Sequence, residues 1–167
     1  GYGHYWAQPY FGYYRSDDEW VIRKHAIMLA NAGVDFIYFD MSNGRIHEDR
    51  LLILLETWKK MREEGLQTPQ FICFLGDKTD LCFRTAMDAW NTIYKHGLYS
   101  DLWFMWEGKP LILGNLQDVP DEVKENFTVR RSWAFTDWEW YTETEGKGRW
   151  PWIALYPQGP GKNFQGV

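Results

Sequence analysis

Apolar residues along the chain follow two spacings, one typical of helices and one typical of buried strands. Residues 15–33 carry apolar side chains at helical spacing, and Ser16 and Glu19 have the capping-box spacing that predicts the helix start. Gly33 suits the position just after the helix. Residues 34–41 then form a nearly uninterrupted apolar run, which is typical of a strand covered on both faces in a parallel sheet.

The same unit of apolar run, polar end and helix recurs further along the chain. A second helix is expected near residues 51–65 and a third near 81–97, and Glu107-Gly108 is expected to form a turn. A short helix is expected near 119–127, with Pro120 near its first turn. The further expected strands are 70–77, 103–106, 110–114, 128–135 and 150–157. This alternation of strands and helices predicts a parallel α/β fold.

Two α/β architectures suit this pattern. A doubly wound sheet fits a count of about five strands, but no G-x-G-x-x-G turn opens any helix. The strand starts near Val34, Gln70 and Pro110 are spaced a little wider than the ~31 residues per unit of an eightfold barrel. We therefore predict a partial (β/α)8 barrel of TIM type with about five strands. It is expected to be a single domain over residues 1–167 with a loose tail at 159–167.

Polar or aromatic residues stand at the end of every predicted strand, where a barrel of this type places its active-site mouth. They are Asp40, Asn43, Asp77, Lys78, Asn115, Arg130, Arg131, Trp133, Tyr156 and Gln158. Some have alternative roles. Asp40 also suits a cap of the following turn through Ser42 and Asn43, and Asp77 also suits a cap of the third helix. Since neighbours in a strand point to opposite sides, at most one of Arg130 and Arg131 faces the cleft.

The N-terminal segment before residue 16 is rich in glycine and aromatic residues and follows neither period. We predict that His4, Trp6 and Gln8 belong to an aromatic lip of a sugar site, because aromatic rings offer apolar faces to ligands with C–H groups. Aromatic residues make up 19% of the chain, which is compatible with such a cleft or with a bulky core. His4 lacks the companion ligands of a zinc site, and we predict neither a metal site nor a cofactor.

Charge and cysteine content narrow the function classes further. The net charge is −5 and the isoelectric point near 5.4, which gives no electrostatic footprint for nucleic acid or anionic membranes. Two cysteines are too few for a disulfide framework, and no segment has the length and hydrophobicity of a membrane span. We expect a carbohydrate ligand, no nucleic acid, no membrane-spanning segment and no specific protein partner.

Three segments of the chain resemble the bacterial glycoside hydrolase family 71/99-like proteins. They are YFGYYRSDDEWVIRKHAIMLANAGVDFIYFDMSNG, SDLWFMWEGKPLILGN and RRSWAFTDWEWY…GKGRWPWIALYPQ. The shorter EGKPLI is shared with the wider relatives, fungal α-1,3-glucanases and endo-α-mannosidases. The resemblance implies a (β/α)8 barrel, an α-linked or otherwise complex glycan as substrate, a periplasmic or extracellular location, and a chain that is a fragment of a longer protein. An open barrel of this kind is expected to self-associate.

Glycoside cleavage usually needs two carboxyl groups, ~5–5.5 Å apart in retaining enzymes and ~6.5–9.5 Å apart in inverting ones. Asp40 and Asp77, at adjacent strand ends, are the candidate catalytic carboxylates, and the decisive acid is expected beyond Val167. Asp40, Asn43 and Asp77 are expected to bind sugar hydroxyls, and Trp6, Trp133 and Tyr156 to shape the pocket. A non-catalytic carbohydrate-binding barrel is the alternative. A nucleotide-binding domain is disfavoured by the missing phosphate loop.

Overall fold

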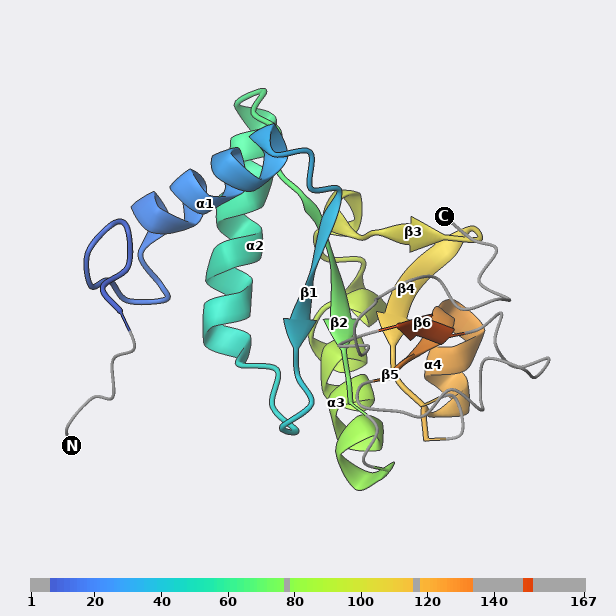
Figure 1. The fold of residues 1–167 in the computed structure, drawn as a ribbon. Helices are drawn as coiled ribbons and strands as arrows, with labels where there is room; N and C mark the ends of the chain where they lie inside the picture. The colour runs from blue at the N-terminus through green and yellow to red at the C-terminus, as the bar shows by residue number, and fades with distance from the viewer. Residues whose placement is uncertain (1–6, 77–78, 116–117, 134–148, 152–167) are drawn as a thin grey trace. The chain divides into compact units, whose positions relative to one another are not determined.

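The computed structural model describes residues 7–76, 79–115, 118–133 and 149–151 (Figure 1). The chain divides into two compact units, one from Gly1–Asp35 with His47–Pro69 and the other from Phe36–Ile46 with Gln70–Val167. None of the helices in the described ranges combines the length and the hydrophobicity needed to cross a membrane.

The described residues of the first unit form two helices, α1 (Glu19–Asn31) and α2 (Glu48–Glu63). The predicted capping box is wrong, because α1 begins after Asp18 rather than after Ser16. Asp18 has extended backbone angles, and its carboxylate accepts a hydrogen bond from the backbone N–H of Val21 at 3.2 Å. An aspartate in this position satisfies one of the otherwise unpaired N–H groups of the first turn.

Glycines end both helices of this unit as predicted. Gly33 and Gly65 have φ of +76° and +82°, and the residues after them donate to carbonyls in the last helical turn: Val34 N to Leu29 O at 3.1 Å, and Leu66 N to Met61 O at 2.9 Å. This is the hydrogen-bond pattern of the Schellman motif, in which a left-handed residue closes the helix.

The second unit is built on a sheet of five parallel strands, which confirms the predicted parallel α/β class. In spatial order the strands are β1 (Phe36–Asp40), β2 (Gln70–Phe74), β4 (Lys109–Leu113), β5 (Thr128–Trp133) and β6 (Arg149–Pro151). A sixth strand, β3 (Met105–Trp106), pairs with β4 antiparallel. The helices in the described part of this unit are α3 (Thr79–Thr92) and α4 (Asp121–Asn126), with 3-10 turns at Tyr94–His96 and Ser100–Leu102.

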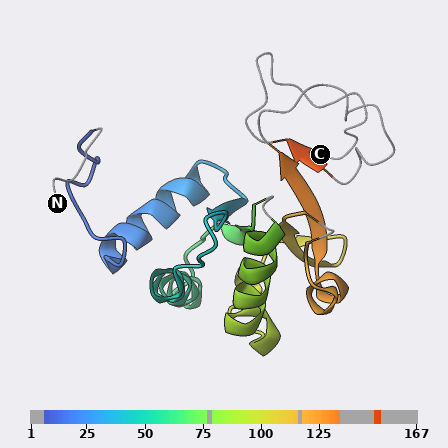
Figure 2. The same cartoon turned by 90° about the horizontal axis from the view of Figure 1, so that it is seen from below.

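One face of this sheet is covered by α3, the turn that follows it, and α4. Phe71 and Cys73 of β2 point to this face, where both contact Tyr94. The helices α3 and α4 lie side by side (Figure 2), with the Trp90 indole N–H donating to Glu122 at 2.9 Å. Burial raises the pKa of the Cys73 thiol to about 12, so the thiol is an ordinary core group rather than a nucleophile.

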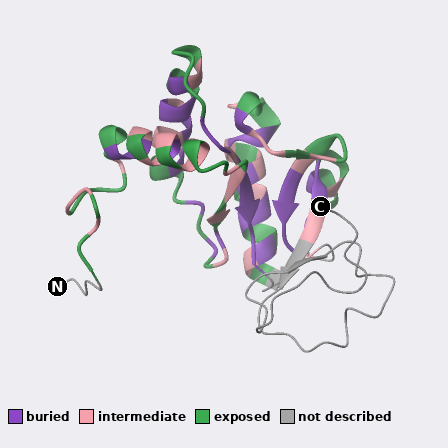
Figure 3. Ribbon diagram, turned by 45° about the horizontal axis from the view of Figure 1, so that its top comes forward, coloured by how far each residue is buried: buried purple, intermediate pink, exposed green. Residues whose placement is uncertain are grey.

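The opposite face, called here the inner face, is lined by the alternate residues of the strands. Its buried core is Ile72, Phe74, Leu111 and Leu113, with Phe36, Phe104 and Trp106 packed against it. Figure 3 shows β2 and β4 as the buried centre of the sheet. The register Tyr38↔Ile72 and Asp40↔Phe74 places Tyr38 and Asp40 on this same face.

The predicted strand 103–106 is shorter than expected, because Phe104 bonds to the neighbouring strands through its backbone and only Met105–Trp106 form β3. Phe104 donates its N–H to Phe71 O at 3.1 Å and accepts from Leu111 N at 3.0 Å, so it lies between β2 and β4 near their amino ends. Direct pairing of β2 with β4 is confined to Cys73↔Ile112 and Phe74↔Leu113. The turn after β3 forms as predicted, with Glu107 and Gly108 at φ of +52° and +82°.

The prediction that the first strand is covered on both faces is wrong. Among the described strands β1 pairs only with β2 and forms the edge of the sheet. Its side chains are half-buried or exposed, and Tyr38 retains 41% exposure. An unbroken apolar run therefore marks an edge strand here, in which aromatic side chains occupy both faces.

Candidate functional site

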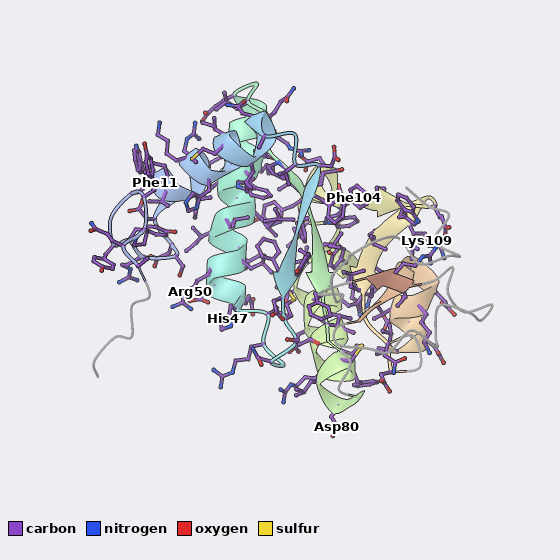
Figure 4. All side chains as sticks on the ribbon, viewed as in Figure 1. Phe11, His47, Arg50, Asp80, Phe104 and Lys109 are labelled. Carbon is purple, nitrogen blue, oxygen red and sulfur yellow. The ribbon has the colours of Figure 1, made fainter. Side chains whose placement is uncertain are left out.

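The carboxyl ends of β1, β2 and β4 meet at one edge of the sheet. Asp80, in the first turn of α3, lies at this end of the unit, whereas Phe104 and Lys109 lie at the other (Figure 4). Backbone hydrogen bonds continue past the strands, from Met41 N to Phe74 O at 2.8 Å and from Leu75 N to Leu113 O at 2.7 Å. We call Asp40–Gly44, Leu75, Gly76, Gly114, Asn115 and Asp118 the carboxyl edge.

Asp40 is the last residue of β1 and is exposed. One carboxylate oxygen accepts a hydrogen bond from the backbone N–H of Ser42 at 2.9 Å, so the turn-capping role considered for this residue is present. The other oxygen has no hydrogen bond within the described part of the chain. Asp40 is thus held in one orientation by its own loop and still presents an acceptor to the solvent.

The loop after Asp40 is anchored from three sides. Met41 is buried at 2% exposure and accepts from Gly44 N at 2.9 Å, which closes the turn. Arg84 of α3 donates to Gly44 O at 3.1 Å. Gly76 lies against Ser42, because a Cβ on Gly76 would stand 2.8 Å from the Ser42 Cβ. Asn43, an exposed residue at the tip of this turn, is therefore carried by a fixed backbone.

The loop after β4 contributes a second polar pair. Asn115 donates its side-chain amide to the Asp118 carboxylate at 2.8 Å, and the Asp118 N–H donates to Asn115 O at 2.9 Å. Asp118 was not predicted from the sequence. The signal that points to it is the Asn-x-x-Asp spacing directly after a buried strand, which favours a side-chain-capped turn.

Arg130 was predicted as a sugar ligand, and the structure gives its guanidinium another partner. Its side chain, 16% exposed, forms an ion pair with Glu107 at 2.6 Å. Glu107 stands in the turn that precedes β4, so the guanidinium is directed toward the β3–β4 hairpin. The two terminal nitrogens of Arg130 donate to the Glu107 carboxylate and to the Val129 carbonyl oxygen.

The structure describes two of the other predicted residues, Gln8 and the backbone of Trp133. Gln8 is exposed in the first unit, before α1. Trp133 ends β5, opposite Pro151 of β6. His4, Trp6, Asp77, Tyr156 and Gln158 lie outside the described residues.

The side chains described here include no group of three histidine, cysteine, aspartate or glutamate residues that could hold a metal ion. No protein-family model matches the chain, and no curated protein matches it.

Proposed function

We propose that the protein is a glycoside hydrolase whose described strands form part of a (β/α)8 barrel. The observation that carries the proposal is the meeting of parallel strand ends, since in such barrels the catalytic groups come from the carboxyl ends of several strands. Asp40 stands at that position on β1, Asn43 lies in the turn after β1, and Asp118 lies in the loop after β4.

The strand order supports the barrel over a doubly wound sheet. The parallel strands follow one another in sequence order, β1-β2-β4-β5-β6, whereas a doubly wound sheet reverses its order at a switch point. Right-handed crossovers in one direction place their helices on one face, and α3 and α4 do share a face. The inner face is then the wall that a barrel would enclose.

Asp40 is proposed as one carboxyl group of the pair at the scissile bond, and Asp40 and Asn43 are also proposed to bind and orient the sugar there. The free acceptor of Asp40 suits a sugar hydroxyl, and the Asn43 amide can donate to one and accept from another. Asp77 follows β2, the neighbour of β1, and we propose it as the second carboxyl group of the pair that glycoside cleavage requires. The resemblance implies export from the cytoplasm.

The experiment is the replacement Asp40→Asn in the full-length protein, assayed on a panel of α-linked glucans and mannans. We expect turnover to fall by roughly two orders of magnitude or more, with unchanged circular dichroism. Asp35→Asn is the matched control, because Asp35 is an exposed aspartate that directly precedes the same strand. Equal rates in wild type and Asp40→Asn would remove Asp40 from the mechanism.

A non-catalytic carbohydrate-binding barrel is the second candidate. The observation in its favour concerns the two carboxylates described at the carboxyl edge, Asp40 and Asp118. Each accepts a hydrogen bond from a neighbouring N–H group, which suits hydroxyl binding and assigns neither group as a proton donor. Binding of a panel glycan without any release of reducing ends would favour this candidate over the hydrolase.

A further inference from the structure

We infer that Tyr38 and Asp40 together form a subsite for one ring of a neutral hexopyranose. The inference rests on the proposed carbohydrate function. It adds the class of sugar, and it names Tyr38 as the side chain that contacts the sugar ring. Neither the aromatic residues of the N-terminal segment nor those near the chain end are involved.

The first observation is position. Tyr38 and Asp40 are two residues apart on an edge strand, so both side chains project from the inner face about 7 Å apart. The register places them opposite Ile72 and Phe74. The Tyr38 ring and the Asp40 carboxylate are thus neighbours on the inner face. Asp40 lies at the carboxyl edge, and Tyr38 lies two residues before it on the same strand.

The second observation is how the tyrosine ring is held. Its centroid is 6.0 Å from that of Phe74, with an angle of 85° between the ring planes. Phe74 is buried, whereas Tyr38 keeps 41% exposure. The edge-to-face contact supports the ring from one side, and its hydroxyl has no hydrogen bond within the described residues.

The third observation is charge. A hexopyranose presents C–H groups on one side and hydroxyl groups at its rim, which match an aromatic face beside a carboxylate acceptor. A uronic acid would bring its own carboxylate close to Asp40, and like charges at short range repel. Arg130 does not offset this charge, because it pairs with Glu107. The subsite is therefore assigned to a neutral sugar.

The experiment is calorimetric titration of the full-length protein with α-1,3-glucotetraose and with α-mannotetraose. For the oligosaccharide that binds wild type, we expect Tyr38→Ala to raise Kd about tenfold and Tyr38→Phe to stay within about twofold, since the ring makes the contact. Tyr38→Leu keeps an apolar side chain on β1 without a ring. Tyr38→Leu should raise Kd as much as Tyr38→Ala does. If Tyr38→Ala does not fold, the Kd of Tyr38→Leu alone tests whether the ring contacts the sugar. Phe83→Ala, which removes an exposed ring from α3, should leave Kd unchanged.

The outcomes separate this inference from the proposed hydrolase. If an oligosaccharide is cleaved and both Tyr38→Ala and Tyr38→Leu keep the wild-type Kd and KM, the subsite is wrong and the hydrolase stands. If binding weakens as expected but no bond is cleaved, the subsite stands and the hydrolase falls. If neither neutral oligosaccharide binds, both fail. Tyr38-dependent binding of tetragalacturonate would overturn the assignment to a neutral sugar.

Discussion

The two ends of the parallel strands are closed in different ways, one at the carboxyl edge and the other at the amino ends of β2 and β4, which we call the amino edge. At the amino edge, the segment Phe104–Lys109 lies against β2 and β4 and covers the inner face with Phe104 and Trp106. Its turn forms an ion pair with Arg130, and Trp106 O accepts from the Thr128 hydroxyl at 2.7 Å. At the carboxyl edge, the loops are anchored through backbone groups and glycines, and the side chains of Asp40 and Asn43 remain exposed.

Under the proposed function, this difference separates stability from ligand binding within one sheet. An edge closed by packed aromatic rings contributes stability through burial. An edge closed by backbone contacts holds its loops in place while leaving side-chain acceptors for a ligand, which is the division seen between the two ends of (β/α)8 barrels. Changes at the amino edge should therefore affect unfolding, and changes to side chains at the carboxyl edge should affect ligands.

The largest loss of stability is expected from Gly76→Ala. Gly76 has φ of +79°, and a Cβ there would stand 2.8 Å from the Ser42 Cβ and 3.0 Å from the Ser42 Cα. The left-handed backbone and the crowding together should lower the free energy of unfolding by about 3 kcal/mol, measured by urea denaturation.

Gly108→Ala is the matched control at the opposite edge. Gly108 has a similar φ of +82°, but nothing lies within 4 Å of its Cβ position, so the change should cost only the left-handed strain of about 1 kcal/mol. Equal losses for the two variants would show that the contact between Gly76 and Ser42 does not hold the loops of β1 and β2 together.

The next largest effect is expected from Phe104→Ala. The Phe104 ring lies 4.1 Å from that of Phe36 and 6.3 Å from that of Trp106. Because the ring is half-buried, its removal should cost about 2 kcal/mol in urea denaturation, less than a fully buried phenylalanine. Phe83→Ala, which removes a ring that is 53% exposed on α3, should cost far less. If the two variants are equally stable, the aromatic cover contributes little.

The parts of the fold that could be predicted from the sequence depend on local signals. The helix ends at Gly33 and Gly65 follow from the freedom of glycine at positive φ, and the parallel class follows from the alternation of apolar runs with helices. The start of α1 was missed because Ser16 and Asp18 are both good caps, and the choice depends on which residue has the extended backbone.

The parts that could not be predicted depend on residues far apart in the chain. Phe104 lies between β2 and β4 because its backbone bonds to Phe71 and Leu111, a pairing that no local period reveals. At the site, Asp40 is marked by its position after an apolar run, but its exposed neighbour Tyr38 looks like any core residue of that run. Tyr38 is exposed because β1 is the outermost of the described strands, and this position depends on the strand order of the whole sheet, which no local pattern gives.

The smallest effect on stability is expected from the ion pair between Glu107 and Arg130, an amino-edge contact of a residue that was predicted to bind sugar. Arg130 is mostly buried and Glu107 is mostly exposed, so the ion pair between them should contribute about 1 kcal/mol. A double-mutant cycle of Glu107→Gln and Arg130→Gln in urea denaturation measures this coupling, and Glu125→Gln, at an exposed position on α4, serves as the control change. A measurable coupling assigns the guanidinium to the hairpin, in line with the division between the two edges. Strictly additive losses would mean that Glu107 does not hold Arg130, and the arginine would then belong with Asp40 and Asn43 among the groups available to a sugar.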